Sequence, residues 1–248
     1  MKTKLEDFRR AAYVDAIYAK MEKDNVVGVF SDKVEALLIS YGFIVYPIIG
    51  LDSYIFEYFN LDNICDPINS TIAYLKTKKC PLIYSSKFFV VDSYCDKFNK
   101  FLIENTDKDV VFENDLKSYL ENLDGIKFDE KIYKESQKKL GKIKNLLEDL
   151  EETSISGDLL FKLEFYIRFI KDLDERISFL EKIRTKYDKK KTERKIIKAT
   201  CSYVVSDIID KKICEDYKIV RSKNPDFTFK KCIYEAEKIL TYKEKWYG

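Results

Sequence analysis

Short continuous apolar runs alternate with stripes of helical spacing along the first half of this chain. Four runs rich in Val, Ile and Phe, at residues 26–30, 43–50, 87–92 and 109–112, have the length and character of buried strands. Segments with helical periodicity separate these runs. A strand, a helix and a strand in close succession predict a βαβ unit and hence a parallel sheet. We therefore expect residues 1–125 to form a small, doubly wound α/β domain.

The segments beside the first strand run carry helix signals. Residues 5–23 predict an amphipathic helix, because apolar side chains recur there at near-helical spacing. The members of that stripe are Leu5, Phe8, Ala12, Ile17 and Met21. After the first strand run, Ser31 and Asp32 can cap a helix, and Gly42 suits the end of that helix.

Helical periodicity dominates the chain from about residue 129. Two apolar stripes run through this part and predict two helices that pack against each other. Their members are Ile132, Leu140, Ile143 and Leu147, then Leu160, Leu163, Ile167 and Ile170. We expect residues 126–190 to form an antiparallel helical hairpin. Residues 191–248 contain a strand-like run and a helical pattern, and predict a reduced C-terminal α/β unit that packs on the rest.

Charge and hydropathy restrict the partners of this protein. Lys and Arg number 45 and Asp and Glu number 43, so the net charge is only +2 and gives no reason to expect nucleic acid. No stretch approaches the roughly 20 apolar residues of a membrane span, and the N-terminal segment lacks the apolar core of a secretory signal. We expect a cytoplasmic protein without membrane partners.

The chain contains no histidine and six cysteines. The absence of histidine excludes Ser-His and Cys-His catalysis and the usual nitrogen ligand of zinc. In a reducing compartment the cysteines are expected as buried apolar residues, metal ligands or nucleophiles rather than disulfides. Without a Cys-x-x-Cys pair, a classical zinc site or a thioredoxin-like redox pair is not indicated.

Two cysteines precede predicted helices. Cys95 follows the third strand run and precedes a helix, and Cys65 lies in a turn before Pro67. Ligands gather at the carboxyl ends of parallel strands, and a helix N-terminus stabilises a thiolate. The plainer interpretation of each is a buried, inert thiol, the commonest state of a free cysteine.

Three stretches carry a resemblance to a known family. They read "GVFSDKVEALLISYGFIVYPIIG", "NICDPINSTIAYLKTKKCPLIYSSKFFVVDSYCDKFNKF" and "SISGDLL", and the likeness extends from about residue 21 to about residue 183. In order and content they resemble the D-component family of 2-hydroxyacyl-CoA dehydratases, which includes benzoyl-CoA reductase subunits. The most specific part is "VVDSYCDKFNK", which resembles the family's cysteine at a strand end.

The resemblance implies a 4Fe-4S cluster with Cys65 and Cys95 as ligands, and Cys214 resembles a cysteine early in the family's second domain. It also implies a lyase or reductase that acts on an acyl-CoA by radical chemistry. The partners implied are a homologous subunit, as a homodimer or heterodimer, and an ATP-dependent activator protein. Such an enzyme belongs in anaerobic, cytoplasmic metabolism.

The second domain departs from the family because it is much shorter here. The segment that carries the family's third ligand has no clear counterpart, and Cys80, Cys201 and Cys232 have no assigned role. The sequence therefore leaves open whether the chain is an enzyme. The alternatives are a cluster-free, non-catalytic scaffold or partner subunit of a full-length homologue, and a CoA-thioester binder without redox chemistry.

Overall fold

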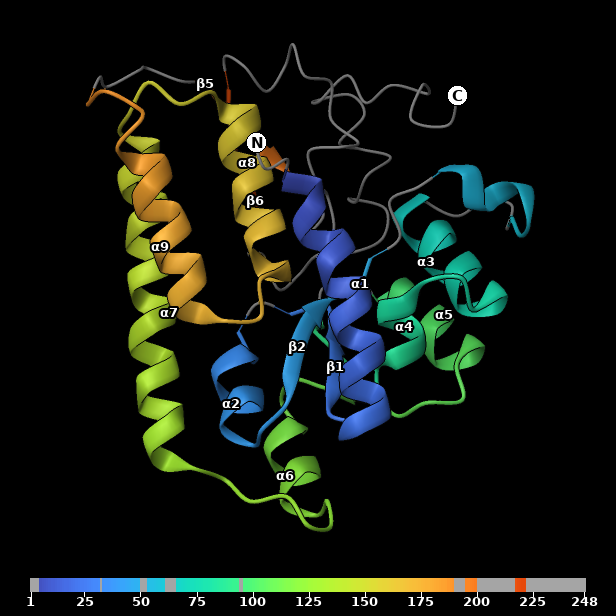
Figure 1. The fold of residues 1–248 in the computed structure, drawn as a ribbon. Coiled ribbons are helices and arrows are strands. Elements are labelled where there is room, and N and C mark those ends of the chain that lie inside the picture. Colours follow the sequence, from blue (N-terminus) through green and yellow to red (C-terminus); the bar gives the residue numbers. More distant parts are fainter. Residues whose placement is uncertain are drawn as a thin grey trace.

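A four-stranded parallel sheet forms the centre of the structure (Figure 1), a computed structural model that describes residues 5–31, 33–49, 53–60, 66–93, 96–189, 195–199 and 217–221. The strands are β1 (Val26–Val29), β2 (Ile44–Pro47), β3 (Phe89–Val91) and β4 (Val110–Phe112), in the order β2-β1-β3-β4. Every neighbouring pair in this sheet is parallel. The predicted α/β fold with a small parallel sheet is confirmed.

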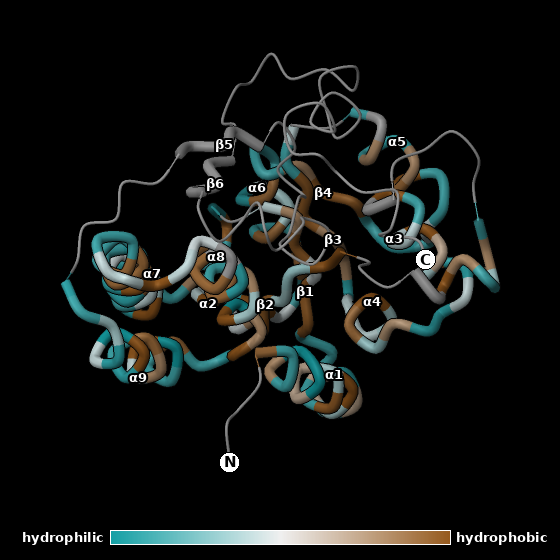
Figure 2. The backbone as a smooth tube through the Cα atoms, turned by 90° about the horizontal axis from the view of Figure 1, so that it is seen from above, coloured by the Kyte–Doolittle hydropathy of each residue, from teal (hydrophilic) through white to brown (hydrophobic). Residues whose placement is uncertain are grey.

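Helices cover both faces of the sheet, as the view from above in Figure 2 shows. On one face lie α1 (Leu5–Glu22), α3 (Asp66–Thr77), α4 (Pro81–Ser85) and α5 (Asp96–Asn105); on the other lie α2 (Glu35–Ser40) and α6 (Leu116–Glu121). Alternate strand residues supply the two cores. Val26 and Phe89 lie in the first core, and Val27 and Val90 lie in the second. The sheet is therefore doubly wound.

The buried face of α1 differs from the predicted stripe. Ile17 is 41% exposed and Met21 is 78% exposed, so these two members of the predicted apolar stripe do not lie on the buried face of the helix. The buried residues of the helix are Arg9, Ala12, Ala16 and Ala19. Three of these are alanines, whose small side chains let the helix lie close to β1 and α4.

Serine 31 does not cap α2, contrary to the prediction. The N-cap position of α2 is Val34, which makes no side-chain cap hydrogen bond; the Ser31 hydroxyl instead donates to Glu113 and accepts from the Lys33 N–H. Asp32, the other predicted cap, lies outside the described residues. The prediction for the other end of this helix is confirmed. Gly42 follows α2 with a φ of +83°, a left-handed conformation that favours glycine.

The helical hairpin predicted for 126–190 contains an additional break. Helix α7 (Glu130–Glu151) is followed by α8 (Gly157–Tyr166), the short 3-10 helix η2 (Ile167–Phe169) and α9 (Leu173–Arg184). Asp172 starts α9 because its Oδ1 accepts hydrogen bonds from the backbone N–H groups of Asp174 and Glu175, at 2.7 and 2.9 Å. The second predicted helix is therefore two α-helices separated by η2.

The helices α7, α8, η2 and α9, here called the helical unit, have their own apolar core. Its buried members include Ile143, Leu163 and Leu180, and the predicted second stripe lies within it or beside it. Ile132 is 41% exposed, so its predicted place in the first stripe is wrong. It lies in the first turn of α7, ahead of the part of that helix that packs on α9.

The described part of the C-terminal region is a pair of parallel strands, β5 (Lys195–Ala199) and β6 (Tyr217–Arg221). They supply strands in this region, as predicted, and the predicted helix of residues 191–248 lies outside the described residues. The predicted domain bounds 1–125, 126–190 and 191–248 remain predictions. Over the described residues, no helix is long and apolar enough to cross a membrane.

Candidate functional site

The sheet order creates a switch point at the carboxyl ends of β1 and β3. The chain passes from β1 to its neighbour β2, then returns across the sheet to β3 on the other side of β1. Ligands of open α/β sheets bind in the crevice outside such a point. Ser31 stands two residues after β1, and Asp92 and Glu113 directly follow β3 and β4. This edge of the sheet is the candidate functional site.

A polar network joins the end of β1 to the end of β4 at this edge. The Ser31 hydroxyl donates to Glu113 Oε2 at 2.8 Å, and the Lys33 ammonium donates to Glu113 Oε1 at 3.2 Å. From η2, Arg168 Nη2 donates to the Ser31 carbonyl at 3.2 Å. The helical unit therefore contributes a guanidinium to the candidate site.

Asn99 fixes the start of α5 to the end of β3. This side chain of α5 is 3% exposed, and its Nδ2 donates to the Asp92 carbonyl at 2.7 Å. Among the described residues its Oδ1 accepts no hydrogen bond. The contact spans the connection in which Cys95 lies, so the two ends of that connection are held together.

The predicted ligands Cys65, Cys95 and Cys214 lie outside the described residues, as do Cys201 and Cys232. The helices that follow two of them are described. Helix α3 begins at Asp66 and α5 begins at Asp96, each one residue after a predicted ligand. The two helices pack on each other and share the first core, through side chains that include Ile72 and Leu102.

Cys80 is the cysteine within the described ranges. It occupies the N-cap position of α4 and is 6% exposed, inside the first apolar core. Such surroundings are typical of an inert structural thiol. Within the described ranges no group of three or more His, Cys, Asp or Glu side chains is arranged to hold a metal ion. The described residues therefore supply no complete metal site of their own.

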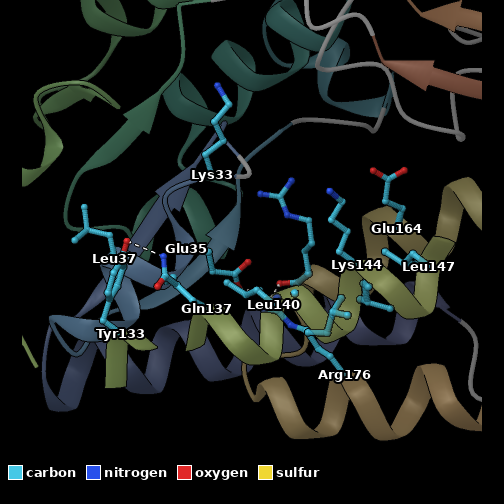
Figure 3. Close-up of a pocket in the computed structure, with 15 residues that line it drawn as sticks. Lys33, Glu35, Leu37, Tyr133, Gln137, Leu140, Lys144, Leu147, Glu164 and Arg176 are labelled. Carbon is cyan, nitrogen blue, oxygen red and sulfur yellow. Dashed lines mark hydrogen bonds and ion pairs between the residues drawn. The ribbon is translucent and has the colours of Figure 1, made fainter. Parts of the chain in front are cut away.

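A groove of about 470 Å³ lies beside the Ser31 end of the candidate site, between α2, α7 and α8 (Figure 3). Lys33, Lys144 and Arg168 are among the residues that line it. The sequence analysis missed this groove. Its signal was present on α7, where Tyr133, Gln137, Leu140, Lys144 and Leu147 recur at helical spacing with a glycine among them.

A buried ion pair forms one end of the groove. Arg176 Nη1 of α9 lies 2.7 Å from Glu35 Oε1 of α2, and the side chains are 2% and 8% exposed. The guanidinium also donates to the carbonyls of Ile170 and Arg168. These contacts hold η2, and with it the Arg168 side chain, against the end of β1.

Lys108 has a perturbed pKa, but it lies at the amino end of β4, away from the candidate site at the carboxyl ends of the strands. It precedes β4, and its ammonium donates to the carbonyls of Ile83, Tyr84 and Ser86 at the end of α4. Burial lowers the pKa of Lys108 to about 8, with a smaller contribution from the positive charge of Lys20. Because three carbonyls hold the amine, its role is to cap α4.

Comparison with known proteins assigns no family. A scan against protein-family models finds none that matches the chain, and a search of curated proteins finds no significant match.

Proposed function

We propose that this chain is an iron-sulfur subunit of a system similar to the 2-hydroxyacyl-CoA dehydratases. Cys65 and Cys95 are its proposed thiolate ligands, and Cys214 is the candidate for a third. In this proposal a homologous subunit and an ATP-dependent activator act with it on an acyl-CoA, either in dehydration or in low-potential reduction.

One observation carries the proposal. Helices α3 and α5 begin one residue after Cys65 and Cys95 and pack on each other beside a parallel sheet. Helix N-termini lower the pKa of thiols, and iron-sulfur clusters are bound by thiolates. If Cys65 and Cys95 are ligands of one cluster, the helices that follow them are expected to lie side by side, as α3 and α5 do.

The chain's own residues have defined parts in this proposal. Asn99 ties the end of β3 to the first turn of α5, the two described segments on either side of Cys95 in the sequence. A bound cluster would supply one low-potential electron to the acyl-CoA. The polar network of Ser31, Lys33 and Glu113 would present hydrogen-bonding groups at the same edge of the sheet.

Single cysteine variants test the proposal. The chain is expressed and purified without oxygen, and iron content and visible absorption are measured for Cys65→Ala, Cys95→Ala and Cys214→Ala. The first two are expected to lose most of the iron, and loss in the third identifies the third ligand. Cys80→Ala is the matched control, because Cys80 lies in the apolar core and should not affect iron.

Equal iron in Cys65→Ala, Cys95→Ala and the unchanged chain would contradict the assignment of these ligands. If the unchanged chain binds no iron, the alternative of a cluster-free partner subunit replaces the proposal. That alternative predicts that Cys95→Ala folds normally and leaves the activity of a full-length homologue unchanged.

A further inference from the structure

Helix α1 presents an apolar stripe at the surface of the protein, opposite its buried alanine face. Four large apolar residues of this stripe recur at the spacing of one helix face, and their exposed fractions range from 41% to 78%. They are Val14, Ile17, Tyr18 and Met21. Figure 2 shows α1 at the margin of the molecule. The helix therefore carries apolar residues on two opposite faces, of which only one packs on its own chain.

Tyr84 of α4 extends the exposed apolar surface beside the stripe. This residue is 52% exposed, and the Lys20 ammonium of α1 lies 5.6 Å from the centre of its ring. We call the stripe and Tyr84 together the α1 face. Charged side chains lie around it and include Arg10, Asp15 and Asp24. Large exposed apolar surfaces with a polar rim mark protein interaction sites.

A second copy of the chain fits the α1 face because the stripe is complementary to itself. In a dimer with two-fold symmetry the same surface meets itself, so each contact occurs twice. Two antiparallel α1 helices with the two-fold axis beside Ile17 bring Met21 of each copy next to Val14 of the other. Apolar residues then meet apolar residues along the whole stripe, and the two helix dipoles are antiparallel.

Opposite charges meet at both ends of such a helix pair. Arg10 and Asp24 each lie seven residues from Ile17, so Arg10 of one copy reaches the level of Asp24 of the other. Within its own chain Arg10 pairs with Asp7 at 3.2 Å, and Asp24 pairs with Lys20 at 3.3 Å. These exposed pairs are worth little and can rearrange. A net charge of only +2 also gives little repulsion between two copies.

We propose that this protein forms a two-fold symmetric dimer through antiparallel α1 helices, with Val14, Ile17 and Met21 at the centre of the interface. The contact of one helix pair lies near the low end of specific interfaces, about 1,200 Å² in total, so we expect micromolar affinity. The proposal goes beyond the iron-sulfur function and does not depend on it. Cys65→Ala and Cys95→Ala are expected to dimerise like the unchanged chain, so the two proposals fail or succeed separately.

Sedimentation equilibrium of the full chain tests the proposal, with a thiol reductant present so that disulfides between copies do not contribute. Between about 1 and about 200 µM, a range that brackets micromolar affinity, the mass is expected to rise from monomer toward dimer. Ile17→Lys brings two ammonium groups together at the two-fold axis and is expected to weaken dimerisation by about a hundredfold. A monomer at every concentration, with the α1 face left to another partner, would overturn the proposal.

Met21→Lys is a second variant that separates dimerisation from folding. Met21 is 78% exposed in the single chain, and a lysine in the last turn of a helix is favourable, so the fold should remain intact. Dimerisation is expected to weaken by about tenfold or more, because the lysine lies against Val14 of the other copy. Circular dichroism of the variants at low concentration checks that their helix content is unchanged.

Ile132→Lys is the matched control for both variants. Ile132 of α7 has the same exposed fraction as Ile17, 41%, and lies outside the α1 face. The variant adds the same charge and is expected to dimerise like the unchanged chain. A dimer that persists in both Ile17→Lys and Met21→Lys, or that Ile132→Lys weakens equally, would overturn the proposal.

Discussion

The ion pair of Glu35 and Arg176 is a buried charged contact between the sheet region and the helical unit. Both side chains are almost fully buried, and their oxygen and nitrogen lie 2.7 Å apart. Two charges removed from water cost several kcal/mol unless they remain paired. Glu35 belongs to α2 and Arg176 to α9, so the pair joins the α/β sheet region to the helical unit.

The first prediction is that Glu35→Ala lowers the free energy of unfolding by about 3 kcal/mol, because it leaves the buried Arg176 charge uncompensated. Urea unfolding at neutral pH measures this loss. Lys142→Ala is the control, because the pair of Lys142 and Glu181 is about half exposed and its loss should cost less than about 1 kcal/mol. Equal losses in both variants would contradict the account.

Lys108 gives the second prediction, which concerns pH. Its pKa is lowered from 10.5 to about 8 by burial, so the unfolded chain binds more protons than the folded chain between these two values. Stability therefore rises with pH in this window. Compared with Lys108→Met, the unchanged chain should gain about 1 kcal/mol from pH 8 to pH 10.5 after allowance for solvent screening.

Urea unfolding of both proteins at several pH values across this window measures the gain. Tyrosine ionisation affects both proteins and cancels in their difference. If the stability of the unchanged chain relative to Lys108→Met falls as pH rises through the window, the folded state binds more protons than the unfolded state. That result would contradict the prediction.

At the scale of elements, the sequence predicts the strands well and the helix faces less well. Continuous runs of Val, Ile and Phe identify all four strands of the central sheet, because only a buried parallel strand tolerates apolar residues on both faces. The break before α9 was missed although Asp172 and Glu175 form a capping signal, since the apolar periodicity continues across it. Periodicity also misplaced Ile17 and Met21, because it cannot distinguish a face built from alanine.

The third prediction concerns two glycines, whose replacement by alanine should change the free energy of unfolding in opposite directions. A Cβ at Gly28 of β1 would overlap Ile48 Cγ1 and lie 2.8 Å from Phe89 Cδ1 and Ser86 Oγ. Gly28→Ala is therefore expected to lower the free energy of unfolding by about 2 kcal/mol. Gly141→Ala meets no atom within 4 Å and is expected to raise it by about 0.5 to 1 kcal/mol. Chemical denaturation measures both, and the same sign in both variants would contradict the account.

At the scale of the whole molecule, the sequence identifies the edge of the sheet that carries the candidate site but not all of its parts. The carboxyl ends of the strands follow from the βαβ pattern, and the predicted ligands Cys65 and Cys95 precede helices that pack together. Arg168 could not be predicted there. It contacts Ser31 across 137 positions of the chain, and only the docking of the helical unit brings the two together.

The central claim is that Cys65 and Cys95 hold an iron-sulfur cluster. The most direct test is the iron and acid-labile sulfide content of the full chain after anaerobic purification. The account predicts about four iron and four sulfide per bound cluster, with the iron lost in Cys65→Ala and Cys95→Ala and kept in Cys80→Ala. Negligible iron and sulfide in the unchanged chain would contradict it.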